Sequence, residues 1–312
     1  MKILITGGAG FIASNIADAY LEDGHEVAVV DNLFSGFRGN VNPQATFYAC
    51  DIRDAEHLGR CFDEFCPDVV SHHAAQLDVR KAVSDPVYDA DVNIKGALNV
   101  LLHAVRVGAQ RFIFSSTGGA VYGEPQFLPV TEDHPVAPES PYGLTKFTFE
   151  HYLRIWSHLH EITPIVLRYA NIYGPRQTAH GEAGVVAIFA GLLLADKACS
   201  IFGDGSMTRD YVYVGDVVAA NRAALTRGDN QIINIGTGVE TSTREGFDAV
   251  RTAVGSGPME PIFLPERPGE VHNICLDNSH AGEVLGWQPQ VEFREGVRRT
   301  VEWQRQTMRI ED

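Results

Sequence analysis

Apolar runs alternate with helix-like segments through the first half of the chain. The runs that predict strands lie near residues 2–6, 26–30, 46–49, 68–71 and 110–115. A helix-like segment follows each run, and this alternation is typical of parallel strands joined by crossover helices. Uninterrupted apolar runs such as Val27–Val30 are typical of strands that are covered on both faces. The pattern predicts an α/β protein built on a doubly wound parallel sheet.

This rhythm weakens beyond about residue 175. Glycines in Gly203–Gly205 and several prolines separate shorter elements there: Pro258, Pro261, Pro265 and Pro268. We expect a nucleotide-binding domain in residues 1–175 and a smaller, mixed α/β, mainly substrate-binding region in residues 176–312. The sequence shows no repeat or flexible linker, so the two should pack closely. Ile232–Ile235 is expected to return to the main sheet.

Composition narrows the class of partner. The 312 residues are 45% apolar and 21% charged, with a formal charge of −15 at pH 7. A chain this negative is not expected to bind nucleic acid or an anionic membrane, and local arginines would have to hold an anionic substrate. No apolar stretch is long enough to span a bilayer, and the N-terminus enters a strand without a signal-peptide pattern.

The potential metal ligands are scattered in the sequence. Five cysteines lack zinc or redox spacing: Cys50, Cys61, Cys66, Cys199 and Cys275. We expect them to be reduced core thiols of a cytoplasmic protein. His72 and His73 suggest a metal pair, but no carboxylate or cysteine cluster accompanies them, and no metal is predicted.

A glycine-rich turn follows the first predicted strand and opens a helix. It fits the pattern G-x-x-G-x-x-A, which lets a pyrophosphate approach backbone N–H groups at a helix N-terminus. Asp31 ends the second strand roughly 20 residues later, where a carboxylate accepts ribose hydroxyls and repels a 2′-phosphate. The pattern predicts NAD in a Rossmann-type fold; an ordinary strand–turn–helix is the alternative. The cofactor-binding residues predicted here are Gly7, Gly10, Phe11, Ile12, Asp31 and Asn32.

Two later strand ends offer further cofactor contacts. Asp51 and Ile52 follow the third strand and are expected to contact adenine, although Asp51 fits a helix cap equally well. Ala74 and Ala75 follow the fourth strand and are small enough to let the cofactor approach. These four residues join the predicted cofactor site.

Tyr142 and Lys146 lie four residues apart, so on a helix they share one face. A phenol has a reference pKa of about 10 and is a poor base at neutral pH. A neighbouring ammonium and a nicotinamide cation would favour the phenolate and make Tyr142 a usable base. The spacing alone is a weak signal, and its weight comes from the surrounding motifs.

Motifs along almost the whole chain resemble those of the extended short-chain dehydrogenases/reductases, and within that group the UDP-glucose 4-epimerases. The matching segments are Thr6–Ile12, His72–Gln76, Asp91–Gly96, Ser115–Gly123, Tyr142–Lys146, Arg168–Arg176, Arg209–Val214 and Arg267–Glu270. The resemblance implies further cofactor contacts from Gln76, Asn93, Ser115 and Tyr169. Asn93 is also a candidate for bracing the active-site strands.

The resemblance implies chemistry at sugar carbon 4. Tyr142 would remove the 4-hydroxyl proton while NAD takes hydride, and Lys146 would bind the nicotinamide ribose and stabilise the phenolate. Thr117 would bridge the 4-oxygen and the phenol. A gapless comparison with the serine-rich motif places Gly118 at the hydroxyl position, and glycine has no hydroxyl. Thr117 is then the nearest hydroxyl, and Ser116 is the alternative. The 4-keto sugar then rotates and hydride returns to its other face, so NAD should stay tightly bound.

Gly118 and Gly119 stand where sugar-nucleotide 4,6-dehydratases typically carry Asp-Glu. Without these carboxylates, elimination of water has no obvious catalyst in this loop, and epimerisation is favoured. The pair also counts, less strongly, against decarboxylases of UDP-glucuronate.

The family motifs also imply residues that hold the UDP group. Arg209 and Arg267 would clamp the diphosphate, to which Asn171 would donate a hydrogen bond. Glu270 would accept the uridine ribose hydroxyls. A solvated surface charge is the alternative for either arginine alone.

The apolar segment 184–189 is predicted to wrap the nucleotide. Val185 and Phe189 would then lie near uracil. The same pattern describes an apolar helix, and core packing explains it almost as well.

Predicted helices near residues 86–107 and 141–160 resemble those through which the family forms homodimers by four-helix packing. His158 and His160 would be exposed or at that interface. The leading hypothesis is an NAD-dependent UDP-glucose/UDP-galactose 4-epimerase. Its rivals are a 4-epimerase of N-acetylated or uronic UDP-sugars, a dehydratase and, in a different class, a non-catalytic NAD-sensing protein. The last predicts loss of the tyrosine or the lysine, and both are present.

Overall fold

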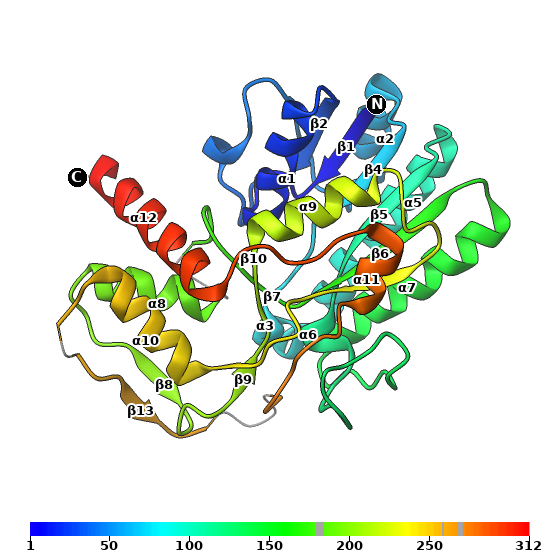
Figure 1. Cartoon of the computed structure of the whole chain (residues 1–312). Coiled ribbons are helices and arrows are strands. Elements are labelled where there is room, and N and C mark those ends of the chain that lie inside the picture. Colours follow the sequence, from blue (N-terminus) through cyan, green and yellow to red (C-terminus); the bar gives the residue numbers. More distant parts are fainter. Residues whose placement is uncertain (179–183, 258, 267–270, 312) are drawn as a thin grey trace.

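A parallel sheet of seven strands forms the centre of the molecule (Figure 1). The computed structural model describes residues 1–178, 184–257, 259–266 and 271–311, the side chains of 309–311 excepted. In spatial order the strands are β11 (Ile232–Ile235), β6 (Thr163–Tyr169), β5 (Arg111–Thr117), β4 (Val69–His72), β1 (Lys2–Thr6), β2 (Glu26–Asp31) and β3 (Thr46–Ala49). This confirms the strands predicted in the first half and the return of Ile232–Ile235 to the sheet. The strand order changes direction between β1 and β4, the place where a doubly wound sheet binds its ligand.

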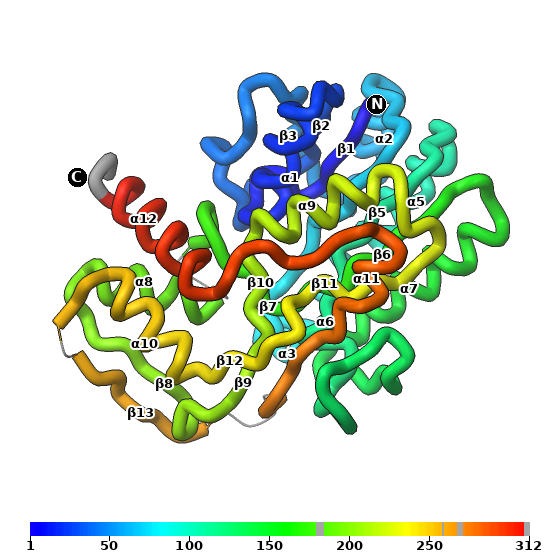
Figure 2. Tube along the Cα trace, viewed as in Figure 1, coloured from blue at the N-terminus to red at the C-terminus, as the bar shows by residue number. Residues whose placement is uncertain are grey.

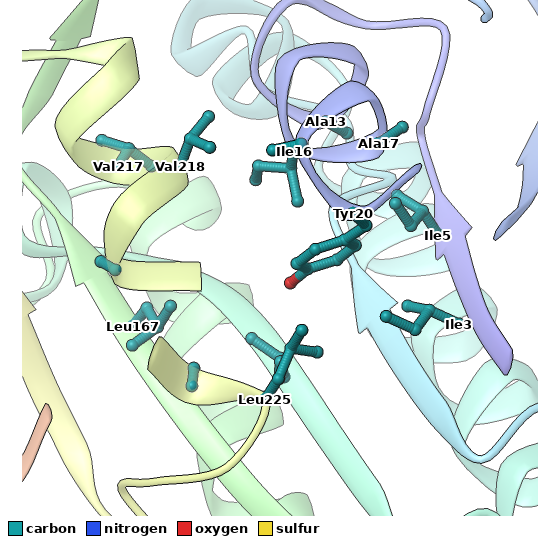
Figure 3. Packing of buried hydrophobic residues seen from close by; sticks show 14 of the residues in the cluster. Ile3, Ile5, Ala13, Ile16, Ala17, Tyr20, Leu167, Val217, Val218 and Leu225 are labelled. Atoms are coloured by element: carbon teal, nitrogen blue, oxygen red, sulfur yellow. The ribbon is translucent and has the colours of Figure 1, made fainter. Parts of the chain in front are cut away.

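Helices cover both faces of the sheet, because strands that are apolar on both sides must bury both. One face carries α1 (Phe11–Glu22), α9 (Val214–Ala224) and α11 (Ser279–Leu285). The other carries α2 (Ala55–Phe65), α5 (Ala97–Arg106) and α7 (Pro141–Leu159). Figure 3 shows Tyr20 of α1 packed among apolar side chains, and its hydroxyl donates to the Asn221 carbonyl at 3.2 Å. This bond ties α1 to α9 across more than half of the sequence.

Short helical elements after β4 and β5 lie next to the predicted site. They are α3 (Val79–Ser84), α4 (Pro86–Ala90), the π-helical turn η2 (Asp91–Gly96) and α6 (Gly118–Val121), in addition to η1 (Arg38–Asn40) after β2. α4, η2 and α5 form one helical stretch, and α7 packs against α3, α4, η2 and α6. The start of α7 is therefore held by elements that follow two neighbouring strands.

A second, smaller part of the molecule lies at one side of the sheet (Figure 1). Its helices are α8 (Val185–Leu194), α10 (Thr243–Val254) and α12 (Phe293–Glu311). Its short strands form the pairs β7 (Asn171–Tyr173) with β10 (Tyr211–Tyr213), β9 (Thr208–Arg209) with β12 (Thr241–Ser242), and β8 (Ser200–Phe202) with β13 (Ile262–Leu264). The chain crosses repeatedly between the two parts (Figure 2), so residue 175 as a domain boundary stays a prediction.

Two expectations drawn from composition have a structural outcome. Among the described residues, no helix combines the length and the apolar character required to cross a membrane. All five cysteines are free thiols, but Cys66 at the end of α2 is exposed, so the prediction that they are core residues is wrong for this one.

Candidate active site

The glycine turn after β1 forms a cradle against the end of β4. Gly7 has a φ of +72°, and a Cβ at this residue would lie 2.7 Å from the Ala74 backbone nitrogen. Gly10 caps α1 without a side-chain hydrogen bond, which leaves the first N–H groups of Phe11 and Ile12 open to an anion. The cradle and the free helix start fit a dinucleotide pyrophosphate.

Asp31 lies at the end of β2 and holds the glycine turn in place. Its carboxylate accepts the Ala9 N–H at 3.0 Å and the Leu33 N–H at 2.7 Å. The next residue, Asn32, is exposed and its amide donates to Asp51 at 2.9 Å. The predicted adenosine end of the site is therefore one hydrogen-bonded unit.

The helix-cap alternative for Asp51 is wrong, because Asp54 caps α2 by accepting the His57 N–H at 3.0 Å. Asp51 instead accepts two bonds from the Arg53 guanidinium, at 3.0 and 2.8 Å. This guanidinium holds the pKa of Asp51 well below its usual range. Ile52 is buried beside Gly96, where a Cβ would lie 2.8 Å from the Ile52 side chain.

The two adjacent histidines bind to different hydroxyls. His72 Nδ1 lies 2.7 Å from the Thr6 hydroxyl, and His73 Nε2 lies 2.9 Å from that of Ser71. Thr6 also accepts the Ala74 N–H at 3.2 Å, which fixes the start of the Ala74–Ala75 segment beside the cradle. His73 Nδ1 is buried without a hydrogen-bond partner in the described protein, so it is a polar atom that a bound cofactor can satisfy.

The structure distinguishes the two candidate hydroxyls at the end of β5. Ser116 is buried and donates to Glu150 at 2.5 Å, and Glu150 pairs with Arg168 at 2.6 Å. Because side chains alternate along a strand, Thr117 points to the opposite face. A Cβ on Gly119 would lie 3.8 Å from the Thr117 hydroxyl and 3.7 Å from the Asn171 side-chain oxygen. The geometry favours Thr117 over Ser116.

The start of α7 lies unusually close to α6. Ser140 caps α7 by accepting the Gly143 N–H at 3.1 Å. A Cβ on Gly143 would collide with the Ala120 carbonyl oxygen. Glycine at this residue therefore lets the start of α7, which carries Tyr142, lie against α6, the element that follows β5.

Lys146 is buried, and its ammonium donates to the Ser115 carbonyl at 2.8 Å. Burial lowers the pKa of Lys146 to about 8, against the opposing effect of the Asp89 and Glu150 carboxylates. For Tyr142, burial and then the Asp89 carboxylate raise the pKa above its ordinary value. The protein alone thus keeps the phenol protonated, and additional positive charge is needed to make it a base.

Sequence reasoning missed Asp89, which is fully buried in α4. Its carboxylate accepts hydrogen bonds from the Gln76 amide at 3.0 Å, the Asn93 amide at 3.0 Å and the Thr145 hydroxyl at 2.9 Å. Asn93 also bonds both backbone groups of Gln76, so it joins the segment after β4 to the helices, which is consistent with the bracing role predicted for it. The only signal in the sequence was the spacing of Asp89 and Asn93, four residues apart on one helix face.

Tyr169 at the end of β6 turns into the core. Its hydroxyl accepts from the Asn221 amide at 2.8 Å, and its ring lies parallel to His73 at 6.5 Å. Its side chain is thus committed to packing under the predicted cofactor site.

The substrate side is more open. Asn171 is exposed, and the Arg209 guanidinium donates to the carbonyl oxygens of Thr208 and His272 at 2.8 and 3.2 Å. Both hydrogen-bond partners of Arg209 among the described residues are therefore neutral carbonyls. Arg267 and Glu270 lie outside the described residues.

The two residues predicted near uracil both lie in α8 but have different surroundings. Val185 is its first residue and is half-buried. Phe189 is 1% exposed and packs edge-on against Phe247, with ring centroids 5.6 Å apart. The structure favours core packing for Phe189 and leaves Val185 as the candidate.

The glycine pair after Thr117 has two different surroundings. A Cβ on Gly118 would collide with Leu276, whereas one on Gly119 would have only ordinary contacts. An acidic side chain at residue 118 would therefore require Leu276 to move, whereas the surroundings of residue 119 would admit one. The prediction that this loop does not catalyse dehydration thus rests on the residue types themselves.

Known proteins share this architecture along the whole chain. A model of the NAD dependent epimerase/dehydratase family matches residues 3–236. The UDP-glucose 4-epimerase of Mycolicibacterium smegmatis is 47% identical over 309 residues, covering 97% of this chain and 98% of that protein.

Two crystal structures are similarly close. The UDP-glucose 4-epimerase of Thermotoga maritima with UDP-glucose has a TM-score of 0.97 and 46% identity, covering 99% of this chain and 100% of that one. The Thermus thermophilus UDP-glucose 4-epimerase in complex with NAD has a TM-score of 0.93 and 44% identity, covering 98% and 99%. These similarities confirm the resemblance, the Rossmann-type fold and the use of NAD that the motifs predict. The chain belongs to the NAD dependent epimerase/dehydratase family.

Proposed function

We propose that this chain is an NAD-dependent 4-epimerase that interconverts UDP-glucose and UDP-galactose. The observation that supports the proposal is the close approach of the start of α7 to the end of β5: Lys146 donates to the Ser115 carbonyl at 2.8 Å, and Gly143, next to Tyr142, lies against α6, which follows Thr117. The same loop carries glycine at both places where a dehydratase would need carboxylates. A role in galactose metabolism and a cytoplasmic location follow from this proposal as predictions.

The residues of the chain divide the chemistry at carbon 4. NAD, when bound along the cradle of Gly7 and Gly10, supplies the nicotinamide that exchanges hydride with carbon 4. Tyr142 accepts the proton of the 4-hydroxyl and later returns it. Thr117 holds the 4-oxygen against the phenol, and Lys146 holds the nicotinamide ribose.

Charge at the site explains why the base acts only in the complete complex. Burial and Asp89 raise the pKa of Tyr142, so the phenolate forms only when opposing positive charge is added. The nicotinamide cation would supply this charge, in addition to the Lys146 ammonium of the protein itself. Because the pKa of Lys146 is lowered to about 8, its ammonium is still the dominant form at neutral pH. Proton removal is thereby linked to the oxidised cofactor.

The UDP group binds, in this proposal, beside β7 and β9, which carry Asn171 and Arg209. Asn171 and Arg209 hold the diphosphate, and Arg209 can do so because its described partners are only neutral carbonyls. Arg267 and Glu270 are proposed for the diphosphate and the uridine ribose, and Val185 for the uracil. Release of the 4-keto sugar is prevented by this grip on the UDP group while the sugar rotates.

A homodimer is proposed through the outer surface of α5 and α7. Four large apolar side chains there are 44–65% exposed: Leu102, Leu144, Ile155 and Leu159. His158 and His160 at the end of the same helix are exposed as well. Four-helix packing between two copies would bury this surface.

The test is incubation of the purified protein with a panel of UDP-sugars and no added cofactor. The products are separated by chromatography and their masses are measured by mass spectrometry. A product of unchanged mass from UDP-glucose or UDP-galactose is expected. Turnover only of N-acetylated or uronic UDP-sugars would move the assignment to another 4-epimerase. Loss of water would identify a dehydratase, and no turnover with NAD bound would revive the non-catalytic hypothesis.

A further inference from the structure

Three potential metal ligands meet where β3 ends and α2 begins. Cys50 follows β3 directly, and His57 and Cys61 lie one turn apart in α2. The ligand atoms of these three side chains all lie within 4.8 Å of one another. Throughout the part of the chain that the structure describes, no other set of three such side chains is this close.

We propose that Cys50, His57 and Cys61 form a binding site for a zinc-class divalent cation, separate from the epimerase chemistry. Thiolate and imidazole are the ligands zinc prefers, and Cys₂His with water in the fourth place is an established zinc set. Zinc–ligand bonds of about 2.0–2.3 Å place tetrahedral ligand atoms roughly 3.5–3.8 Å apart. The three side chains therefore need to close by only about 1 Å.

Burial gives the site an inner and an outer side. Cys50 and Cys61 are each 2% exposed, whereas His57 is half-buried and provides the way in from solvent. The thiols donate only weakly to backbone carbonyls, Cys50 to Asp51 at 3.4 Å and Cys61 to His57 at 3.3 Å. Both sulfur atoms are thus available to a cation without loss of a strong hydrogen bond.

Carboxylates lie next to the cluster in the chain. Asp51 follows Cys50 directly, and Asp54 caps α2 by accepting the His57 N–H. A divalent ion that binds the two sulfur atoms displaces their thiol protons.

The sequence hides this site because its ligands come from two elements. The spacing Cys-x₆-His-x₃-Cys matches no zinc motif. Only the turn from β3 into α2 brings Cys50 back onto the face that His57 and Cys61 share. The expectation that the chain has no metal site rested on spacing alone.

The test uses the reduced full-length protein with its cofactor, and zinc or cobalt ions alone as probes. After gel filtration we expect about one zinc per chain, and with cobalt a thiolate-to-metal charge-transfer band. His57→Gln should weaken zinc binding by at least about tenfold, and Cys61→Ala should abolish the cobalt band. Zinc should also raise the Tm of the wild type but not that of Cys61→Ala.

Two cysteine variants control for the loss of a thiol. Cys66→Ala removes an exposed thiol at the end of α2, and Cys199→Ala removes one that is 0% exposed elsewhere. Both should keep the zinc and the cobalt band. Wild-type protein that retains no zinc, or retention that His57→Gln and Cys61→Ala leave unchanged, would overturn the proposal. If Cys61→Ala does not fold, the test rests on zinc binding by His57→Gln, since His57 is only half-buried.

Discussion

The cofactor side of the proposed active site and its substrate side are built differently. On the cofactor side the protein itself holds the polar groups: backbone N–H groups bond Asp31, and Lys146 bonds the Ser115 carbonyl. On the substrate side Asn171 is exposed, and Arg209 bonds only backbone carbonyls in the described protein. We expect the cofactor, which should stay bound, to meet polar side chains that the protein already holds in place, and the exchanging substrate to meet charges that are still free to bind it.

Buried hydrogen-bond networks stabilise the cofactor side. Asp89 collects three hydrogen bonds from residues on three segments, and Glu150 joins Ser116 to Arg168 in a buried pair. Breaking such a network is costly, because it leaves buried polar groups without partners. Changes on the cofactor side should therefore alter turnover or stability, and changes on the substrate side should alter substrate affinity.

The largest effect is expected for Tyr142→Phe. Loss of the proton acceptor should lower kcat by about 10²–10⁴-fold, the usual contribution of a general base. Bound NAD, extracted and quantified after denaturation, should remain at the wild-type amount. Tyr152→Phe, further along the same helix, is the control and should keep its turnover. Turnover near that of the wild type in Tyr142→Phe would refute the assigned role.

Lys146→Met should make the protein more stable and inactive. Its pKa falls from 10.5 to about 8 through burial, so a charged Lys146 costs the fold up to about 3 kcal/mol. Below pH 8 the ammonium is charged in both states and the full cost applies. Between about pH 8 and 10.5 the unfolded chain binds more protons, so the wild type gains stability as the pH rises. Urea unfolding across this range should show the advantage of the variant shrinking, and a constant advantage would contradict the lowered pKa.

The cofactor side could be predicted from the sequence, because its functional residues lie in short local patterns. Strand runs, the glycine turn, Asp31 and the pair Tyr142 and Lys146 all repeat a pattern whose spacing is set by backbone geometry. Asp89 escaped notice because a carboxylate in a short helical segment usually faces solvent, and only tertiary packing buries it. The choice between Thr117 and Ser116 also needed the strand, since the direction of a side chain depends on register.

The substrate side was harder to predict, for a physical reason. An apolar helix that wraps a ligand and one that packs in a core have the same composition, so Phe189 could be assigned only from its burial against Phe247. The cluster of Cys50, His57 and Cys61 depends on a turn between two elements and leaves no spacing that a motif could capture. Residues brought together by a crossover are the ones that linear patterns miss.

Arg209→Gln should affect substrate affinity more than chemistry. A charged hydrogen bond to phosphate contributes about 1.5–3 kcal/mol, so KM for UDP-galactose should rise roughly tenfold to a hundredfold. The amount of bound NAD should not change, because Arg209 is not part of the cofactor side. Arg222→Gln is the matched control, because the Arg222 guanidinium pairs with Asp23 at 2.7 Å at the C-terminal end of α1. Equal loss of NAD and of substrate affinity in Arg209→Gln would erase the proposed difference between the two sides.

The smallest expected effect compares two helical glycines. In Gly143→Ala a methyl group would collide with the Ala120 carbonyl. Overpacking of this kind destabilises the fold by about 1–3 kcal/mol, and the better helix propensity of alanine offsets about 1 kcal/mol of this. In Gly246→Ala the methyl meets nothing within 4 Å, so only the gain of about 1 kcal/mol remains. Thermal unfolding should thus shift in opposite directions, and only Gly143→Ala should lower kcat, because α7 must move Tyr142 away from Thr117. If Gly143→Ala matched Gly246→Ala in both stability and turnover, the close approach of α7 to α6 would have no part in placing the base.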